Sequence, residues 1–154
     1  MNIRDLYKEY TSLDGSTVEI NGWVRTNRAS KAFGFIELND GTFFRSVQVV
    51  YEEAFLENFE EISKMLTASA VTVQGIVELT PQGKQPFEIK ARSVKVEALS
   101  DPSYPLQKKR HSMEFLREIA HLRPRSNTFS AVFRVRSLLA YAVHKFFQER
   151  GFVY

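Results

Sequence analysis

Hydrophobic and polar residues alternate in five separate stretches of the first hundred residues. In the first stretch, Val18, Ile20 and Val24 face one side and polar residues face the other, as in a half-buried strand. The other four stretches are residues 34–38, 43–51, 69–79 and 86–99. The pattern therefore predicts five strands, and a short helix before the first of them.

One intervening segment, residues 52–66, has a helical period instead. Five apolar side chains recur at helical spacing and five glutamates cover the remaining surface. Three strands, one helix and two strands is the element order of the OB-fold, a mainly β, five-stranded Greek-key barrel with one inserted helix. Other small β-barrels contain similar short alternating segments, so the element order alone does not exclude them.

The pattern changes after residue 100. A linker with Pro102 and Pro105 leads into a basic, partly helical segment, and together these occupy residues 101–127. We expect Thr128 to cap a long amphipathic helix that ends near Arg150, with Gly151 just beyond its C-terminus. Its apolar stripe requires a partner, which is either the body of a second domain or another copy of the chain. The predicted organisation is thus an OB-fold domain over 1–100, a linker, and a long helix over 128–154.

Charge is distributed unevenly between these parts. Residues 1–103 contain 11 Lys or Arg and 15 Asp or Glu, whereas residues 104–154 contain 10 and 3. A basic tract of this kind suggests a polyanionic partner, although it is also compatible with a solvated face.

The segment KAFGFIEL, residues 31–38, places two phenylalanines on the side of the second strand that should face water. An exposed aromatic ring can stack on a nucleic-acid base, an arginine can contact phosphate, and a glutamine amide can match the edge of a pyrimidine. The candidate residues near this face are Phe33, Phe35, Arg25, Arg28, Lys31 and Gln48, with Gln82 and Lys84 on the Pro/Gly turn that follows the fourth strand. The competing interpretation is that the two rings pack beneath a helix. The pattern favours the binding site without excluding that packing.

Local signatures of enzyme chemistry are missing from the sequence. It contains no phosphate-binding glycine loop, HExxH, nucleophile elbow or CxxC, and its three histidines are scattered. We expect no catalytic residue and no metal site in these residues. The chain has no cysteine, no secretory signal pattern and no apolar run of membrane-spanning length, which is consistent with a cytoplasmic protein.

Two segments resemble the class IIb aminoacyl-tRNA synthetases. GWVRTNRASKAFGFIELNDGTFFRSVQVV is similar to the anticodon-binding OB domain of the aspartyl, asparaginyl and lysyl enzymes, and RHSMEFLREIAHLRPR resembles the bacterial-type asparaginyl group. HKFFQERGFVY is similar to the helix of class II motif 1.

The resemblance implies roles for particular residues. Phe35 matches the phenylalanine that stacks on the central anticodon uracil, Gln48 the glutamine that hydrogen-bonds it, and Arg28 the arginine beside it. The turn around Gln82 and Lys84 is similar to the loop that approaches the other anticodon bases. The implied partner is a tRNA with the anticodon GUU.

The resemblance also implies a larger protein. The family attaches an amino acid, here asparagine, to tRNA using ATP and Mg²⁺, but the motifs for that reaction are absent, so we expect this chain to bind tRNA without catalysing the reaction. The motif 1 helix implies a homodimer, with Phe133, Leu139, Val143 and Phe146 at its interface. The alternatives are an aspartyl-type synthetase, a free-standing OB module that binds single strands without sequence preference, and an assembly module.

Overall fold

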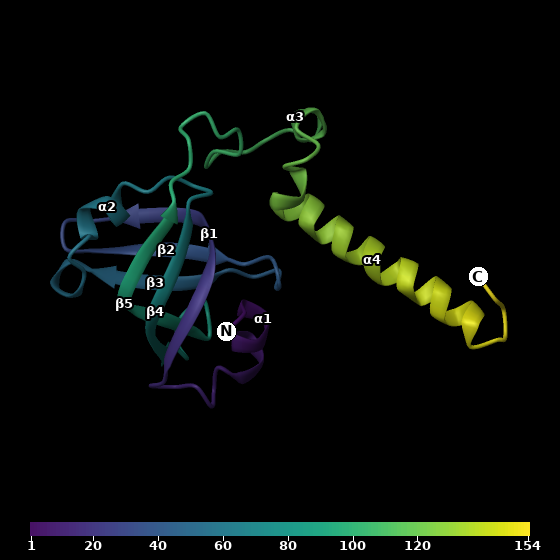
Figure 1. The fold of residues 1–154 in the computed structure, drawn as a ribbon, viewed down its shortest axis with the longest axis horizontal. Helices are drawn as coiled ribbons and strands as arrows, with labels where there is room; N and C mark the ends of the chain where they lie inside the picture. Colours follow the sequence, from purple (N-terminus) through teal and green to yellow (C-terminus); the bar gives the residue numbers. More distant parts are fainter. The chain divides into compact units, whose positions relative to one another are not determined.

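The computed structural model describes all 154 residues, which form two compact units, Met1–Lys108 and Lys109–Tyr154. The first unit contains α1 (Ile3–Glu9), β1 (Thr17–Ala29), β2 (Phe33–Asn39), β3 (Val47–Glu52), η1 (Glu53–Phe55), α2 (Phe59–Ser63), β4 (Ala70–Leu79) and β5 (Phe87–Ala98). The second contains α3 (Met113–Glu118), η2 (Arg123–Arg125) and α4 (Asn127–Gln148). Figure 1 shows these elements coloured along the sequence.

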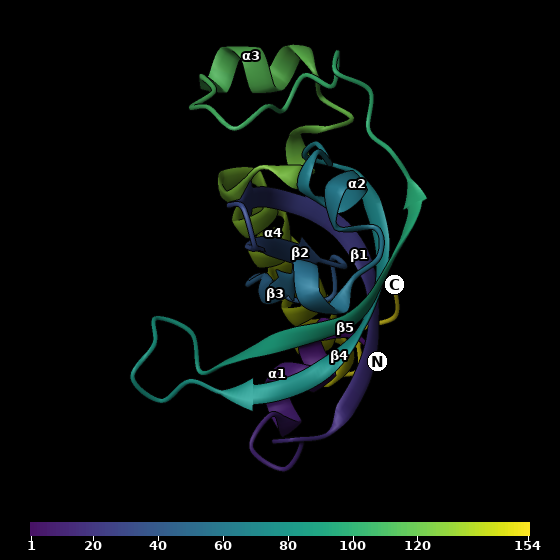
Figure 2. The ribbon, with the colours of Figure 1, turned by 90° about the vertical axis from the view of Figure 1, so that its left-hand side faces the viewer.

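The five strands form a closed barrel in the order β1-β2-β3-β5-β4, in which only the β3–β5 pair is parallel. Strand β1 closes the barrel because its first half pairs with β4 and its second half with β2, and Figure 2 shows it as a long curved strand. Gly22 lies at this crossing, where an added Cβ would come within 2.9 Å of the Asn39 carbonyl oxygen. The predicted OB-fold barrel is confirmed.

The core fills the barrel with the inward-facing residues of each strand. Alternation places Ile20, Ile36 and Val73 inside, each at most 1% exposed, as a sheet closed on itself requires. Helix α1 covers one end, where Ile3 and Leu6 are fully buried.

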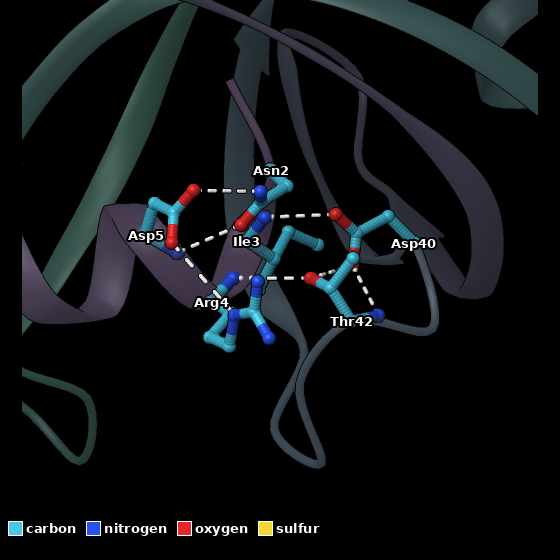
Figure 3. A network of polar contacts seen from close by, with 6 residues as sticks. All are labelled: Asn2, Ile3, Arg4, Asp5, Asp40 and Thr42. Atoms are coloured by element: carbon cyan, nitrogen blue, oxygen red, sulfur yellow. Dashed lines mark hydrogen bonds and ion pairs between the residues drawn. The ribbon is translucent and has the colours of Figure 1, made fainter.

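Polar contacts attach α1 to the turn between β2 and β3 (Figure 3). The Ile3 amide donates to Oδ2 of Asp40 at 2.8 Å, and the Arg4 amide donates to Oγ1 of Thr42 at 3.1 Å. Asn2 caps the helix with its own side chain by accepting from the Asp5 amide at 2.8 Å. The turn and the cap thus satisfy amides that a helix N-terminus leaves without intrahelical partners.

The single helix expected over residues 52–66 is wrong, because the segment forms two short pieces, η1 and α2. Between them Leu56 is extended, with φ −126° and ψ 111°, and its side chain enters the core at 5% exposure. Asn58 donates through Nδ2 to the Val94 carbonyl at 2.9 Å. These tertiary contacts override a weak local helix preference, and they leave Phe55 53% exposed.

The third strand is also shorter than expected, since it begins at Val47 rather than residue 43. Phe43 packs against Tyr7 with ring centroids 4.8 Å apart. Phe44, its neighbour, is 49% exposed in the turn.

The long C-terminal helix α4 begins at Asn127, and Ser126 rather than Thr128 is its N-cap. Ser126 has an extended backbone and its hydroxyl accepts from the Phe129 amide at 3.4 Å, whereas Thr128 is already helical. The predicted role of Gly151 is confirmed by its φ of +81°. Its amide donates to the Gln148 carbonyl at 3.0 Å and the Phe152 amide donates to the Phe147 carbonyl at 3.2 Å, which is the Schellman arrangement.

No residue of α4 is buried. The apolar stripe along it is Val132, Val135, Leu139, Val143 and Phe146, each about half exposed or more. None of the helices has both the length and the hydropathy that crossing a membrane would require.

Candidate nucleic-acid interface

The outer face of strands β1, β2 and β3 brings four of the predicted binding residues around one hollow. Arg28 pairs with Phe35 across β1 and β2, and Glu37 pairs with Gln48 across β2 and β3. Directly opposed residues of antiparallel strands project to the same face. A shallow hollow of about 410 Å³ is lined by Arg28, Ala29, Ser30, Phe33, Phe35 and Gln48.

Two aromatic rings form one wall of this hollow. Phe33 is 45% exposed and Phe35 is half-buried. Their centroids are 5.6 Å apart with planes at 86°, the edge-to-face arrangement that aromatic pairs favour. Phe59 of α2 contacts Tyr51, at 5.4 Å, and Phe33 and Phe35 contact each other. An aromatic surface therefore remains available for a flat ligand.

Tyr51 supports the two rings from inside the barrel. It pairs with Gly34, which lies between Phe33 and Phe35, and its ring occupies the space where a side chain at Gly34 would project. Its hydroxyl donates to Oδ1 of Asn27 at 2.9 Å, and Nδ2 of Asn27 donates to the Ile62 carbonyl at 2.7 Å, near the end of α2.

The Tyr51 phenol is held in its neutral form by this packing. Its side chain is fully buried, and burial raises the pKa of Tyr51, an effect that the hydrogen bond with Asn27 only partly offsets. The alternation in the sequence placed Gly34 on the core face, but nothing in it indicated which side chain fills the space.

Gln48 is oriented by two residues of β5 that the sequence analysis missed. Its Nε2 donates to Oε2 of Glu88 at 3.1 Å, while Oε1 of Glu88 lies 2.8 Å from Nζ of Lys90. Burial lowers the pKa of Lys90, but the hydrogen bond and the attraction of Glu88, helped by Glu78 and Glu52, outweigh burial and leave the pKa raised. The only sequence signal is the alternation of Glu88 and Lys90 on a predicted strand.

Arg28 interacts weakly with its neighbours and can turn toward a ligand. Its Nη2 lies 4.0 Å from Oε1 of Glu37, and both side chains are about half exposed, so the pair contributes at most about 1 kcal/mol. A guanidinium at this place can contact a phosphate or stack on a base.

The other four predicted residues do not line the hollow. Arg25 is half-buried at the β1 irregularity, and Lys31 is exposed in the β1–β2 turn. Gln82 and Lys84 are exposed in the β4–β5 turn, which projects from the barrel in Figure 2. Thr80 holds that turn by donating to the Gln85 carbonyl at 2.7 Å.

Helix α4 carries a second surface, separate from the first. A shallow apolar groove of about 530 Å³ is lined by Val132, Val135, Arg136, Leu139, Ala140, Val143 and His144. Phe146 extends the stripe beneath the Arg150 guanidinium, which lies 3.6 Å from its ring. Phe133 lies outside the groove lining, half-buried against Arg123.

The structure contains no group of three or more His, Cys, Asp or Glu residues that could hold a metal ion. His111 stacks on Phe115 at 5.3 Å and His144 contacts Tyr154 at 4.8 Å. The aromatic, arginine and amide groups of the outer face are suited to stacking, charge interactions and hydrogen bonding.

The closed barrel and the aromatic, arginine and amide groups on its β1–β3 face define a nucleic-acid-binding protein of the OB type. The chain belongs to the OB-fold nucleic acid binding domain family of tRNA anti-codon domains, which it matches over residues 18–97.

Over its whole length the chain is similar to asparagine–tRNA ligases. It is 65% identical over 152 residues to the ligase of Alkaliphilus oremlandii, covering 99% of this chain and 33% of that protein. The ligase of Clostridium acetobutylicum is 62% identical with the same coverage. The crystal structure of asparaginyl-tRNA synthetase from Pyrococcus horikoshii complexed with asparaginyl-adenylate superposes with a TM-score of 0.86 at 26% identity, covering all of this chain and 36% of that one. The chain thus spans about a third of the length of the curated relatives it matches.

Proposed function

We propose that this chain is the N-terminal anticodon-binding part of an asparagine–tRNA ligase and that it binds the anticodon loop of tRNA through the β1–β3 face. The observation that carries the proposal is the hollow in which Phe35, Gln48 and Arg28 meet. The 65% identity to an asparagine–tRNA ligase supports the asparagine specificity over an aspartyl one.

Each of the three residues has a distinct task. The Phe35 ring stacks on an unpaired base, which contributes roughly 1–3 kcal/mol without reading its identity. Gln48 hydrogen-bonds the edge of that base, and Arg28 contacts the neighbouring phosphate or a second base plane. The base is the central uracil of the anticodon GUU.

The remaining predicted residues surround this central site. Phe33 extends the stacking surface beside Phe35, while Arg25 and Lys31 on one side and Gln82 and Lys84 on the β4–β5 turn serve the flanking nucleotides. Their distribution agrees with a ligand longer than a single base. Phe33, Arg25 and Lys31 lie on or next to β1 and β2, and the β4–β5 turn leads into β5, which pairs with β3.

The longer protein attaches asparagine to its tRNA using ATP and Mg²⁺ in the cytoplasm. The residues present here do not fit that chemistry, since no carboxylate cluster suited to a metal is found among them. In this proposal residues 1–100 bind the anticodon, residues 101–127 are the linker, and residues 128–154 begin the catalytic domain. The α4 stripe forms a homodimer interface through Leu139, Val143 and Phe146, with Phe133 at its margin.

The test is binding of anticodon stem-loops to the 154-residue chain, measured by fluorescence anisotropy. The GUU loop should bind more tightly than loops with a changed central base. Phe35→Ala should weaken every loop by about 1–3 kcal/mol, whereas Gln48→Ala should chiefly remove the preference at the central base. Equal affinity for all loops would identify a single-strand binder without sequence preference. Asparaginylation of tRNA by this chain alone would contradict its assignment as the binding part.

A further inference from the structure

Two local irregularities bring Phe55 and Arg92 together on the outside of the barrel. The break at Leu56 turns the Leu56 side chain into the core and leaves Phe55, in η1, 53% exposed. In β5, Arg92 is an extra residue at a register shift, since its neighbours Ala91 and Ser93 pair with β4 and it does not. Bulges of this kind redirect a side chain and often lie beside functional sites. The Arg92 guanidinium lies over the Phe55 ring, 4.6 Å from its centroid, so the pair forms an exposed platform in which a cation backs an aromatic ring.

This platform adjoins the hollow on the β1–β3 face. Phe33, which lines the hollow, pairs with Glu52 at the end of β3. The next amide, that of Glu53, donates to the Ala32 carbonyl at 2.9 Å. Element η1 is therefore attached to the β1–β2 turn beside Phe33, and Phe55 is its last residue. An RNA strand that leaves the hollow past Phe33 would reach the Phe55 ring next.

The platform has the chemistry that an unpaired nucleotide requires. In the proposed function the hollow holds one base, whereas OB folds bind about 4–16 nucleotides of a single strand. Successive bases of such a strand stack on aromatic side chains, and an arginine beside the ring adds a cation–π contribution. Phe55 and Arg92 supply both groups within one contact.

Charge limits the ligand on the far side of Phe55. On the near side, the exposed cations Lys31 and Arg92 offset the two glutamates at the end of β3 and the start of η1. Three exposed carboxylates follow Phe55 in the sequence, those of Glu57, Glu60 and Glu61. Only Glu60 forms an ion pair, with Lys64 at 2.6 Å. These carboxylates repel phosphate, so a nucleotide stacked on Phe55 is the last one that the barrel accommodates on that side.

We propose that Phe55, backed by Arg92, is a second stacking site, which takes the base of a nucleotide that flanks the central anticodon base. The inference rests on the proposed function and adds a contact outside the hollow. A ring that only stacks contributes affinity and does not read the identity of the base. Binding at this site therefore raises the affinity for every loop alike.

The decisive experiment combines Phe55→Ala with anticodon stem-loops in which one loop nucleotide at a time lacks its base. Phe55→Ala should lower the affinity for the intact GUU loop at least about fivefold, the lower end of the range for one stacked base. Removing the base that occupies the platform should cost the wild-type chain a similar factor, and should cost Phe55→Ala less than about twofold. The ratio of the affinities for the GUU and GCU loops should be the same in both proteins.

Two further variants separate stacking from stability and from the loss of any exposed ring. Phe55→Leu keeps an apolar side chain but removes the flat ring, so it should bind within about twofold of Phe55→Ala and unfold at the same urea concentration as wild type. Phe44→Ala is the matched control, because Phe44 is 49% exposed in the β2–β3 turn. Its affinity for the GUU loop should stay within about twofold of wild type.

The outcomes distinguish this inference from the proposed function. A wild-type chain that binds the GUU and GCU loops equally would contradict the proposed function, and the inference with it. If that preference is present but Phe55→Ala binds as tightly as Phe44→Ala, the second stacking site is overturned and anticodon binding stands, with the exposed ring left to a protein contact. Full affinity in Phe55→Leu, or a loss in Phe55→Ala that is the same whichever base is missing, would also overturn it, because neither result fits stacking of one base on this ring.

Discussion

The contact between Gly34 and Tyr51 predicts that Gly34→Ala destabilises the barrel severely and disrupts the base-binding face. The added Cβ would lie 2.6 Å from Cε1 of Tyr51 and closer still to its Cζ and hydroxyl. Tyr51 cannot move aside, because it is fully buried, its hydroxyl is bound to Asn27 and its ring contacts Phe59. Overpacking in a well-packed core costs typically about 1–3 kcal/mol, and the closed surroundings place this variant at about 3 kcal/mol.

Urea unfolding of the barrel unit, followed by circular dichroism, measures this cost directly. A loss of about 3 kcal/mol corresponds to a fall in Tm of roughly 12 °C or more in a domain of this size. Gly83→Ala is the matched control, because Gly83 lies in the exposed β4–β5 turn, its backbone is not left-handed, and an added Cβ would lie 3.1 Å from the Thr80 carbonyl oxygen, a much looser contact than at Gly34. That substitution should change stability by less than 1 kcal/mol.

A second substitution tests whether the Tyr51 ring is the cause. Tyr51→Leu shortens the side chain beneath Gly34, so Gly34→Ala should cost at least about 1 kcal/mol less in that background, the coupling expected of residues in contact. The reasoning would be refuted if Gly34→Ala were no more destabilising than Gly83→Ala, or if its cost were the same with and without Tyr51. Folded Gly34→Ala protein should also bind the GUU loop more weakly, since Phe35 follows directly in the strand.

The other predictions concern the helix, the dimer and the charges. Ser126→Ala should destabilise the first turn of α4 by about 1 kcal/mol, seen as faster amide exchange there, whereas Thr128→Ala should have little effect. Leu139→Asp should abolish any concentration-dependent self-association in sedimentation, and unchanged association would exclude the α4 stripe as the interface. RNA affinity should fall with salt, and Lys31→Ala or Lys84→Ala should each reduce the slope of log affinity against log salt by about one if that lysine contacts phosphate.

The barrel could be predicted from the sequence because each strand and turn carries its own local signal. Period-two alternation identifies the inward residues, and Asp40-Gly41 identifies a turn, in which Gly41 has φ +81°. The same reasoning failed between residues 52 and 66, where helical spacing was real but two side chains had stronger interactions elsewhere. Leu56 entered the core and Asn58 bound the β5 backbone, so the helix broke between them.

The sequence predicts some of the proximities in the candidate site but not all of them. Phe35 and Arg28 lie on adjacent strands joined by a tight turn, so their proximity follows from antiparallel pairing alone. Glu88 lies 40 residues from Gln48, and only the parallel β3–β5 pair brings them together. That pair depends on closure of the whole barrel, which alternation does not encode.

The outward position of Phe33 and Phe35 follows from the packing inside the barrel. Because successive residues of a strand face opposite sides, the demand that a glycine lie over the Tyr51 ring forces its two neighbours outward. The same buried tyrosine thus requires a glycine between the two rings, so stability of the core and exposure of the base-binding face are coupled through one residue.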